Sequence, residues 1–188
     1  MGGRSIKAFH ITTVLVLALA FVFAESAFSW PRRLFGAQVD LLPALMTFTA
    51  LRLGLGSVIA LSFVGGLTFD ALSLNPLGVS PLPLCLVGSG LHLYREQLLR
   101  DAVFAQAVIG GAASVAVPIG TLLIILTTGV SPLLGLGFLW DLLVMGIGGA
   151  VATPLVFKLM NGLERGLVYQ IHSTPSFRPD REIHRGRN

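Results

Sequence analysis

The sequence predicts an all-α integral membrane protein, and three observations support this fold class. Hydrophobic residues make up 54% of the 188-residue chain and charged residues only 12%, whereas soluble domains contain about 25% charged residues. The mean hydropathy is +0.82. The apolar residues are gathered in runs, separated by charged and turn-forming residues, and most runs are long enough to cross a bilayer as helices.

Six apolar segments divide the chain, and each is expected to form one transmembrane helix. The segments cover residues 8–28, 38–51, 53–72, 77–94, 102–127 and 133–160. Together they predict a transmembrane domain over residues 1–168. The polar, arginine-rich residues 169–188 are expected to form a disordered cytoplasmic tail.

The first two segments each allow a second interpretation. The basic residues before the first run and the Ala24-x-Ser26 pattern after it also fit a cleaved signal peptide. A membrane helix is preferred because the run is long for a signal peptide and another apolar segment follows. The second segment is short for a span, so we expect it to use flanking residues or to cross a thinned part of the bilayer.

The distribution of Lys and Arg predicts the orientation. With six spans and the N-terminus inside, all of the 13 Lys and Arg residues except Arg32 and Arg33 lie on the cytoplasmic side. Because cytoplasmic loops are enriched in basic residues, both termini are expected in the cytoplasm. The same enrichment accounts for the net charge of +4, so we expect contact with membrane lipid and no nucleic-acid partner.

The sequence carries no recognisable set of catalytic or metal-binding residues. Cys85 is the only cysteine, which excludes a disulfide within the chain and a cysteine-based metal site. His92 has no second ligand at a suitable spacing. Walker, HExxH and GxSxG motifs are absent. We therefore expect a protein that is not an enzyme and that needs no cofactor or metal.

The stretch from Gly65 to Gly78 is the most distinctive part of the sequence. Asp70 lies near the end of the third apolar run, the Asn75-Pro76 pair favours a turn, and Gly78 tolerates unusual backbone angles. A carboxylate here is either a helix-end surface charge or a polar anchor for the turn or for a partner. We expect an anchor that accepts hydrogen bonds from backbone N–H groups of the turn.

Two clusters of small residues are expected to allow close helix packing. Gly65 and Gly66 lie in the third segment, and Gly146, Gly149 and Ala150 lie in the sixth. Each cluster either packs inside the protein or forms an exposed strip for a partner helix.

Four acidic residues share the outer side under this topology. Glu25, Asp40, Asp70 and Asp141 come from four different segments. Asp70 and Asp141 are expected to face the bundle interior or a shallow outward-facing cavity, and Asp40 is a further candidate for that cavity. A proton or cation path would use such acids. Transport by these acids is the less favoured interpretation, because no acid lies at the midplane with a basic relay.

The stretch from Gly66 to Gly78 resembles the rod shape-determining protein MreD family. In that family a glycine-rich third helix ends in Asp, and a Ser-x-x-Pro-Leu-Gly-like turn follows. Asp40 to Pro43 and Thr153 to Phe157 are similar to further parts of the family, so the resemblance covers about residues 8–168. Asp141 belongs to no part of this pattern, and the tail is longer than is usual.

The resemblance implies a non-enzymatic membrane subunit of the bacterial cell-elongation complex, in the cytoplasmic membrane. Such a subunit binds the bitopic protein MreC and acts with a glycosyltransferase and transpeptidase pair in peptidoglycan synthesis. It connects indirectly to the actin-like MreB filament. The resemblance also implies a fold similar to the substrate-binding component of ECF transporters. A subunit of such a transporter, binding a small ligand, is the alternative function.

Overall fold

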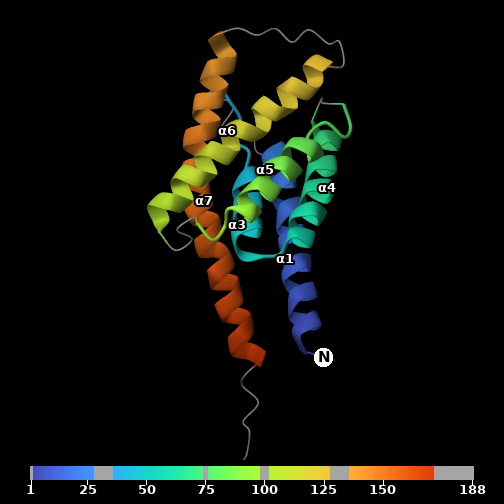
Figure 1. The fold of residues 1–188 in the computed structure, drawn as a ribbon, viewed down its shortest axis with the longest axis vertical. Coiled ribbons are helices and arrows are strands. Elements are labelled where there is room, and N and C mark those ends of the chain that lie inside the picture. The colour runs from blue at the N-terminus through green and yellow to red at the C-terminus, as the bar shows by residue number, and fades with distance from the viewer. Residues whose placement is uncertain (1, 28–35, 74–75, 98–101, 128–135, 172–188) are drawn as a thin grey trace, which may run out of the picture. The chain divides into compact units, whose positions relative to one another are not determined.

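The computed structural model describes residues 2–27, 36–73, 76–97, 102–127 and 136–171, and within these ranges the chain is helical apart from short turns (Figure 1). The all-α prediction is thereby confirmed. Asn75 and the tail residues 172–188 lie outside the described residues. The helices are α1 (Gly2–Ala27), α3 (Leu42–Arg52), α4 (Leu55–Leu72), α5 (Pro81–Leu93), α6 (Val103–Thr127) and α7 (Leu136–Ile171).

Residues 1–157 form one compact unit, and residues 158–188 form a second unit that begins within α7. The last helix is longer than predicted. The expected span ended at residue 160 and the expected tail began at 169, but α7 continues to Ile171. The residues after Met160 include Leu163, Glu164 and Arg165, which favour the helical state even where the sequence is no longer uniformly apolar.

Four of the described helices are long and apolar enough to cross a membrane. They are His10–Ala27 within α1, Leu55–Leu72 in α4, Val103–Thr127 in α6 and Gly137–Leu163 within α7. The other two are shorter than the spans predicted for 38–51 and 77–94, with 11 residues in α3 and 13 in α5. At 1.5 Å per residue they measure about 16 and 20 Å, against about 30 Å of hydrocarbon. The six-span topology therefore stays a prediction.

Helix α3 lies at the centre of the first unit, in contact with α1, α4, α5 and α6. Every residue from Leu42 to Leu51 is buried. The hydroxyls within this segment bond to the helix backbone, as Thr47 Oγ1 donates to Pro43 O (2.9 Å) and Thr49 Oγ1 donates to Leu45 O (2.8 Å). Because both hydroxyls are hydrogen-bonded within the helix, the two threonines can be buried in apolar surroundings.

Two further contacts show how the core is built. Phe48 of α3 meets Phe157 of α7 edge to face, with ring centroids 5.0 Å apart. On α1 the buried residues Val14, Ala18 and Val22 recur every four positions, so one stripe of α1 faces α3 and α4. The other side chains of α1 whose burial is described are half-buried or exposed.

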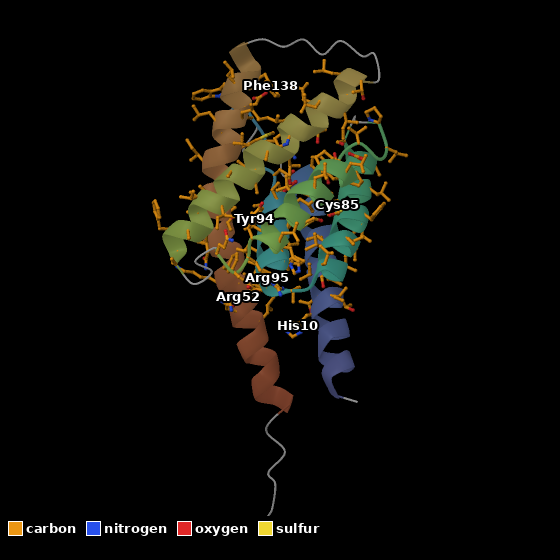
Figure 2. All side chains as sticks on the ribbon, in the orientation of Figure 1. His10, Arg52, Cys85, Tyr94, Arg95 and Phe138 are labelled. Atoms are coloured by element: carbon orange, nitrogen blue, oxygen red, sulfur yellow. The ribbon has the colours of Figure 1, made fainter. Side chains whose placement is uncertain are left out.

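Consecutive helices of the first unit alternate in direction (Figure 1). The ends of α3 and α5 therefore lie at the same end of the unit, where Arg52 and Arg95 are found, away from Phe138 (Figure 2). Arg95 Nη1 donates to Leu53 O (3.5 Å), and His92 Nδ1 lies 2.9 Å from Ala50 O. These contacts tie the end of α5 to the end of α3.

Candidate functional site

The turn between α4 and α5 is organised by the carboxylate of Asp70. Gly78 N–H donates to Asp70 Oδ2 at 2.8 Å, and Ser80 N–H donates to the same oxygen at 3.2 Å. Asp70 is only 1% exposed, although the sequence places it near a helix end. The expected hydrogen bonds to turn backbone are thus present. The importance of Asp70 for function stays a prediction.

The geometry of the turn also depends on Gly78. Its φ of +94° lies in the region that side chains disfavour, so a glycine is suited to this position. Pro76 is exposed beside it. Three residues after Gly78 the chain enters α5, which begins at Pro81, where the missing N–H of proline costs no helical hydrogen bond.

Gly65 and Gly66 of α4 pack inside the protein. A Cβ at Gly66 would lie 2.8 Å from both N and Cα of Pro81, so the backbones of α4 and α5 touch at this point. A Cβ at Gly65 would lie 3.1 Å from Leu42 Cδ1, at the start of α3. Both glycines are buried. Of the two interpretations of this cluster, internal packing is therefore the one that the geometry supports.

The small residues of α7 pack on a matching set in α6. Gly149 lies directly against Ser114 Oγ, and Gly110 lies directly against Thr153 Oγ1. A Cβ at Gly111 would lie 3.0 Å from Gly146 O. This α6 set was not identified as a packing site from the sequence. The signal for it was the run of small residues from Gly110 to Ser114, which resembles the run on α7.

The outer side of this contact forms an open, shallow groove. All its lining residues are apolar, and they come from α6 between Ala107 and Ile119 and from α7 between Leu142 and Ala150. Half of them are small: Ala107, Gly111, Ala112, Ala116, Gly146 and Ala150. We call this surface the α6/α7 groove. Gly146 and Ala150 therefore both contact α6 and border an open surface, unlike Gly65 and Gly66 of α4.

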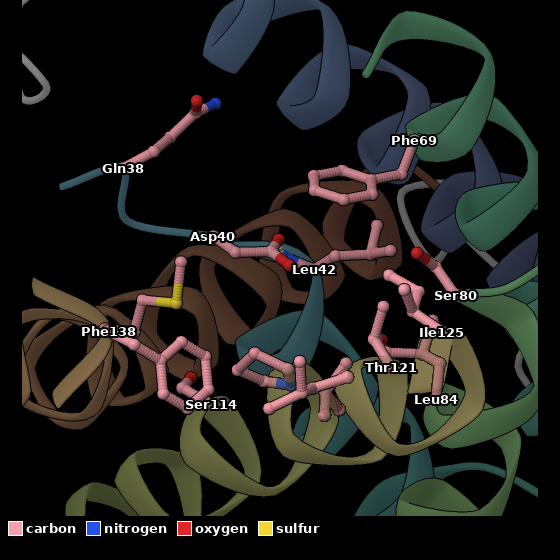
Figure 3. A pocket seen from close by; sticks show the side chains of 14 residues that line it. Gln38, Asp40, Leu42, Phe69, Ser80, Leu84, Ser114, Thr121, Ile125 and Phe138 are labelled. Atoms are coloured by element: carbon pink, nitrogen blue, oxygen red, sulfur yellow. Dashed lines mark hydrogen bonds between the residues drawn. The ribbon is translucent and has the colours of Figure 1, made fainter. Parts of the chain in front are cut away.

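A separate cavity of about 280 Å³ lies where α3 begins, α4 ends and α5 begins (Figure 3). Its walls are mainly apolar and include Phe69, Leu84, Leu122 and Phe138. The polar groups are contributed by Gln38, Asp40, Ser80, Ser114 and Thr121. Among the described residues that line it, none is Lys, Arg or His.

The predicted acidic residues Asp40, Glu25 and Asp141 differ in their position relative to this cavity. Asp40 lines the cavity, and its Oδ1 accepts a hydrogen bond from Leu42 N–H at 2.8 Å. Glu25 lies close behind it, since Glu25 Oε1 accepts from Leu41 N–H at 2.5 Å. Asp141 is half-buried in α7 and does not line the cavity. The expectation of an acid facing a cavity thus fits Asp40, and for Asp141 it stays a prediction.

Comparison with known proteins gives no match to a family model, a curated protein or a solved structure. In the described ranges, no group of three or more His, Cys, Asp or Glu residues is arranged to hold a metal ion. The candidate features of the molecule are therefore the Asp70 turn, the α6/α7 groove and the cavity beside Asp40.

Proposed function

We propose that the chain is a non-enzymatic membrane subunit of the bacterial cell-elongation complex that holds an MreC-like bitopic protein through the α6/α7 groove. The resemblance of residues 66–78 to the MreD family supports the identity of the complex. The observation that supports the place of binding is the continuous apolar groove of small side chains. In the cell, the glycosyltransferase and transpeptidase pair and the MreB-like filament are the further partners of this proposal.

The α6/α7 groove has the properties that a single membrane helix needs. In lipid, association between helices depends on close packing, and small residues let two backbones approach. The part of α6 from Ala107 to Ile119 is about 18 Å long at 1.5 Å per residue, enough for several helical turns of contact. Ala112 and Ala116 are exposed and lie four residues apart, so they share one face of α6.

The glycine pair of α4 does not offer a second docking strip. Gly65 and Gly66 are covered by Leu42 and Pro81 of the same chain. A partner helix would have to displace α3 and α5 to reach them. The partner surface in this proposal is therefore confined to α6 and α7, and the Asp70 turn maintains the packing of α4 on α5.

Site-specific photo-cross-linking tests the docking site. A benzophenone amino acid at Ala112, on the groove, is compared with the same amino acid at Ala71, an exposed alanine of α4 outside the groove. The full chain is produced in bacterial membranes together with an MreC-type protein. We expect a cross-link to the MreC-type protein from position 112 and none from position 71. Equal cross-linking from both positions, or from position 71 alone, would contradict the proposal.

The same proposal includes six spans with both termini in the cytoplasm. The alternating helix directions are compatible with this arrangement, and α3 and α5 would then cross a bilayer thinned by the surrounding helices. Single cysteines are placed at Pro76 and in the predicted tail, in a chain whose Cys85 is replaced. Impermeant maleimide added outside is expected to label position 76 and not the tail. Labelling of the tail from outside would overturn the topology.

The cavity beside Asp40 is the one observation that favours the second candidate function, the binding of a small ligand by a transporter subunit. It is lined by residues of five helices and of the segment before α3, and it combines apolar walls with a few polar groups, as small-molecule sites do. A subunit of this kind would co-purify with an ATPase module, and a scaffold would co-purify with a single-span partner. Mass spectrometry of the purified complex separates the two.

A further inference from the structure

The cavity beside Asp40 has a polar side and an apolar side, which together define the chemistry of a ligand. Its volume of about 280 Å³ is close to the lower limit of about 300 Å³ for pockets that hold drug-sized molecules. One water molecule occupies about 30 Å³ in the liquid, so the space exceeds the need of a single water. The apolar walls are unsuitable for a cluster of waters, since a buried water needs two to four polar partners.

The polar side carries the carboxyl group of Asp40, and a second carboxyl group, that of Glu25, lies close behind it outside the lining. Asp40 and Glu25 accept hydrogen bonds from the adjacent backbone N–H groups of Leu42 and Leu41, so the two carboxyls lie close together. Glu25 Oε2 is buried and has no hydrogen-bond partner among the described residues. Among the described residues that line the cavity, no basic side chain is present to neutralise Asp40. A cationic or hydrogen-bond-donating group would fit beside Asp40, and an anion would be repelled.

A hydroxyl on the cavity wall is also without a partner. Ser114 is 2% exposed, and its Oγ is buried with no hydrogen bond to the described protein atoms. A buried hydroxyl that stays unpaired is destabilising. Ser80 and Thr121 supply further hydroxyls to the same wall. Because Ser114 Oγ lies against Gly149 of α7, the ligand chemistry is inferred from Asp40 and the apolar walls and not from this hydroxyl.

We propose that this cavity binds a small molecule that carries an amine on an apolar body. The ammonium group lies beside Asp40, and the apolar body lies among Phe69, Leu84 and Leu122. The proposal deepens the second candidate function by naming its ligand class. It does not depend on the α6/α7 groove, which is lined by other residues.

A matched series of probes tests the chemistry. The full-length protein in lipid nanodiscs is titrated by calorimetry with 4-phenylbutylamine, 4-phenylbutan-1-ol and 4-phenylbutyrate, which share one apolar body. Empty nanodiscs correct for partitioning into lipid. We expect the amine to bind at least about tenfold more tightly than the alcohol, and the carboxylate not to bind. Equal binding of the three probes, or no binding of the amine above the empty-nanodisc signal, would overturn the proposal.

Two pairs of variants locate the binding. Asp40→Asn keeps an oxygen for Leu42 N–H and removes the charge, so amine affinity should fall about tenfold with little change for the alcohol. Asp141→Asn removes a charge outside the cavity and should leave amine affinity unchanged. Leu122→Trp should abolish binding by filling the cavity, whereas Leu123→Trp, at an exposed neighbour, should not.

Each variant must first fold as the parent protein does. Folding is checked by the position of its size-exclusion peak. Unchanged amine affinity in both Asp40→Asn and Leu122→Trp would place the probe elsewhere and overturn the proposal. If Asp40→Asn does not fold, the Leu122 and Leu123 pair alone decides. Loss of cross-linking from position 112 with intact amine binding would contradict the scaffold function and leave this ligand class standing.

Discussion

The two glycine-rich helix contacts of this protein differ in what lies on their outer side. At the contact of α4 with α3 and α5, Gly65 and Gly66 are buried by Leu42 and by the backbone of Pro81. At the contact of α6 with α7, Gly111, Gly146 and Ala150 border an open groove. In the first contact the small residues serve only the packing of helices. In the second contact they serve packing and also form part of an exposed surface.

The comparison shows why a small-residue motif alone does not identify a partner site. In both contacts the motif brings two helices of the same chain together. What distinguishes them is whether a third element covers the contact. Helix α3 lies against α1, α4, α5 and α6 and fills the space beside the α4 contact. In the described structure, the outer side of the α6 contact with α7 is left open.

The largest effect is expected from Gly66→Leu. A Cβ at this position meets the backbone of Pro81 at 2.8 Å, and backbone atoms cannot rotate out of the way. Overpacking of this kind destabilises by about 3 kcal/mol or more. Purified protein in detergent should lose most of its folded fraction, measured by thermal unfolding. A stable variant that has lost only its partner would show that α4, and not α6, carries the docking strip.

Replacement of Asp70 by Leu is expected to have the next largest effect. Gly78 N–H and Ser80 N–H would lose their acceptor, and the loss of a charge-assisted bond costs about 1.5 to 3 kcal/mol. Asp70→Asn keeps an acceptor oxygen and should be milder. Glu96→Leu, at an exposed acid, should change the melting temperature little. Equal melting temperatures for Asp70→Leu and Glu96→Leu would contradict the anchoring role of Asp70.

Gly65→Ala is expected to have the smallest effect. The nearest atom to its new Cβ is Leu42 Cδ1 at 3.1 Å, the end of a side chain that can adjust. Alanine also favours the helix by about 1 kcal/mol relative to glycine, so the net change should stay within about 1 kcal/mol. Gly66→Ala serves as the neighbouring comparison and should be clearly less stable in the same unfolding measurement. Similar values for both would show that α5 can move away from α4.

Much of the fold follows from local sequence patterns, and the remaining features depend on tertiary contacts. The all-α class and the end of α4 at Leu72 were predictable, because apolar runs and turn residues act locally. A short α3 was expected, since the second segment is short for a span, but the shortness of α5 was missed because the apolar run already begins in the turn before Pro81. The continuation of α7 to Ile171 was missed because the residues after Met160 still favour a helix although the apolar pattern has ended.

The candidate sites divide in the same way. The hydrogen bonds of Asp70 to its own turn were expected, since the carboxylate and the turn are close in sequence. The cavity next to Asp40 was not resolved, because its wall combines residues from five parts of the chain, including Ser114 and Phe138. Asp141 shares the outer side with Asp40 under the predicted topology, but its rotation about the axis of α7 depends on packing that the sequence does not reveal.

The most direct test of the central claim is co-purification of an MreC-type partner with the Ala116→Phe variant. Ala116 is exposed in the α6/α7 groove, so a phenyl ring there blocks a partner helix without meeting the protein's own core. We predict that partner recovery from detergent-solubilised membranes falls about tenfold or more while the thermal stability is unchanged. Ala71→Phe, outside the groove, should retain the partner. Full recovery of the partner with Ala116→Phe would contradict the account.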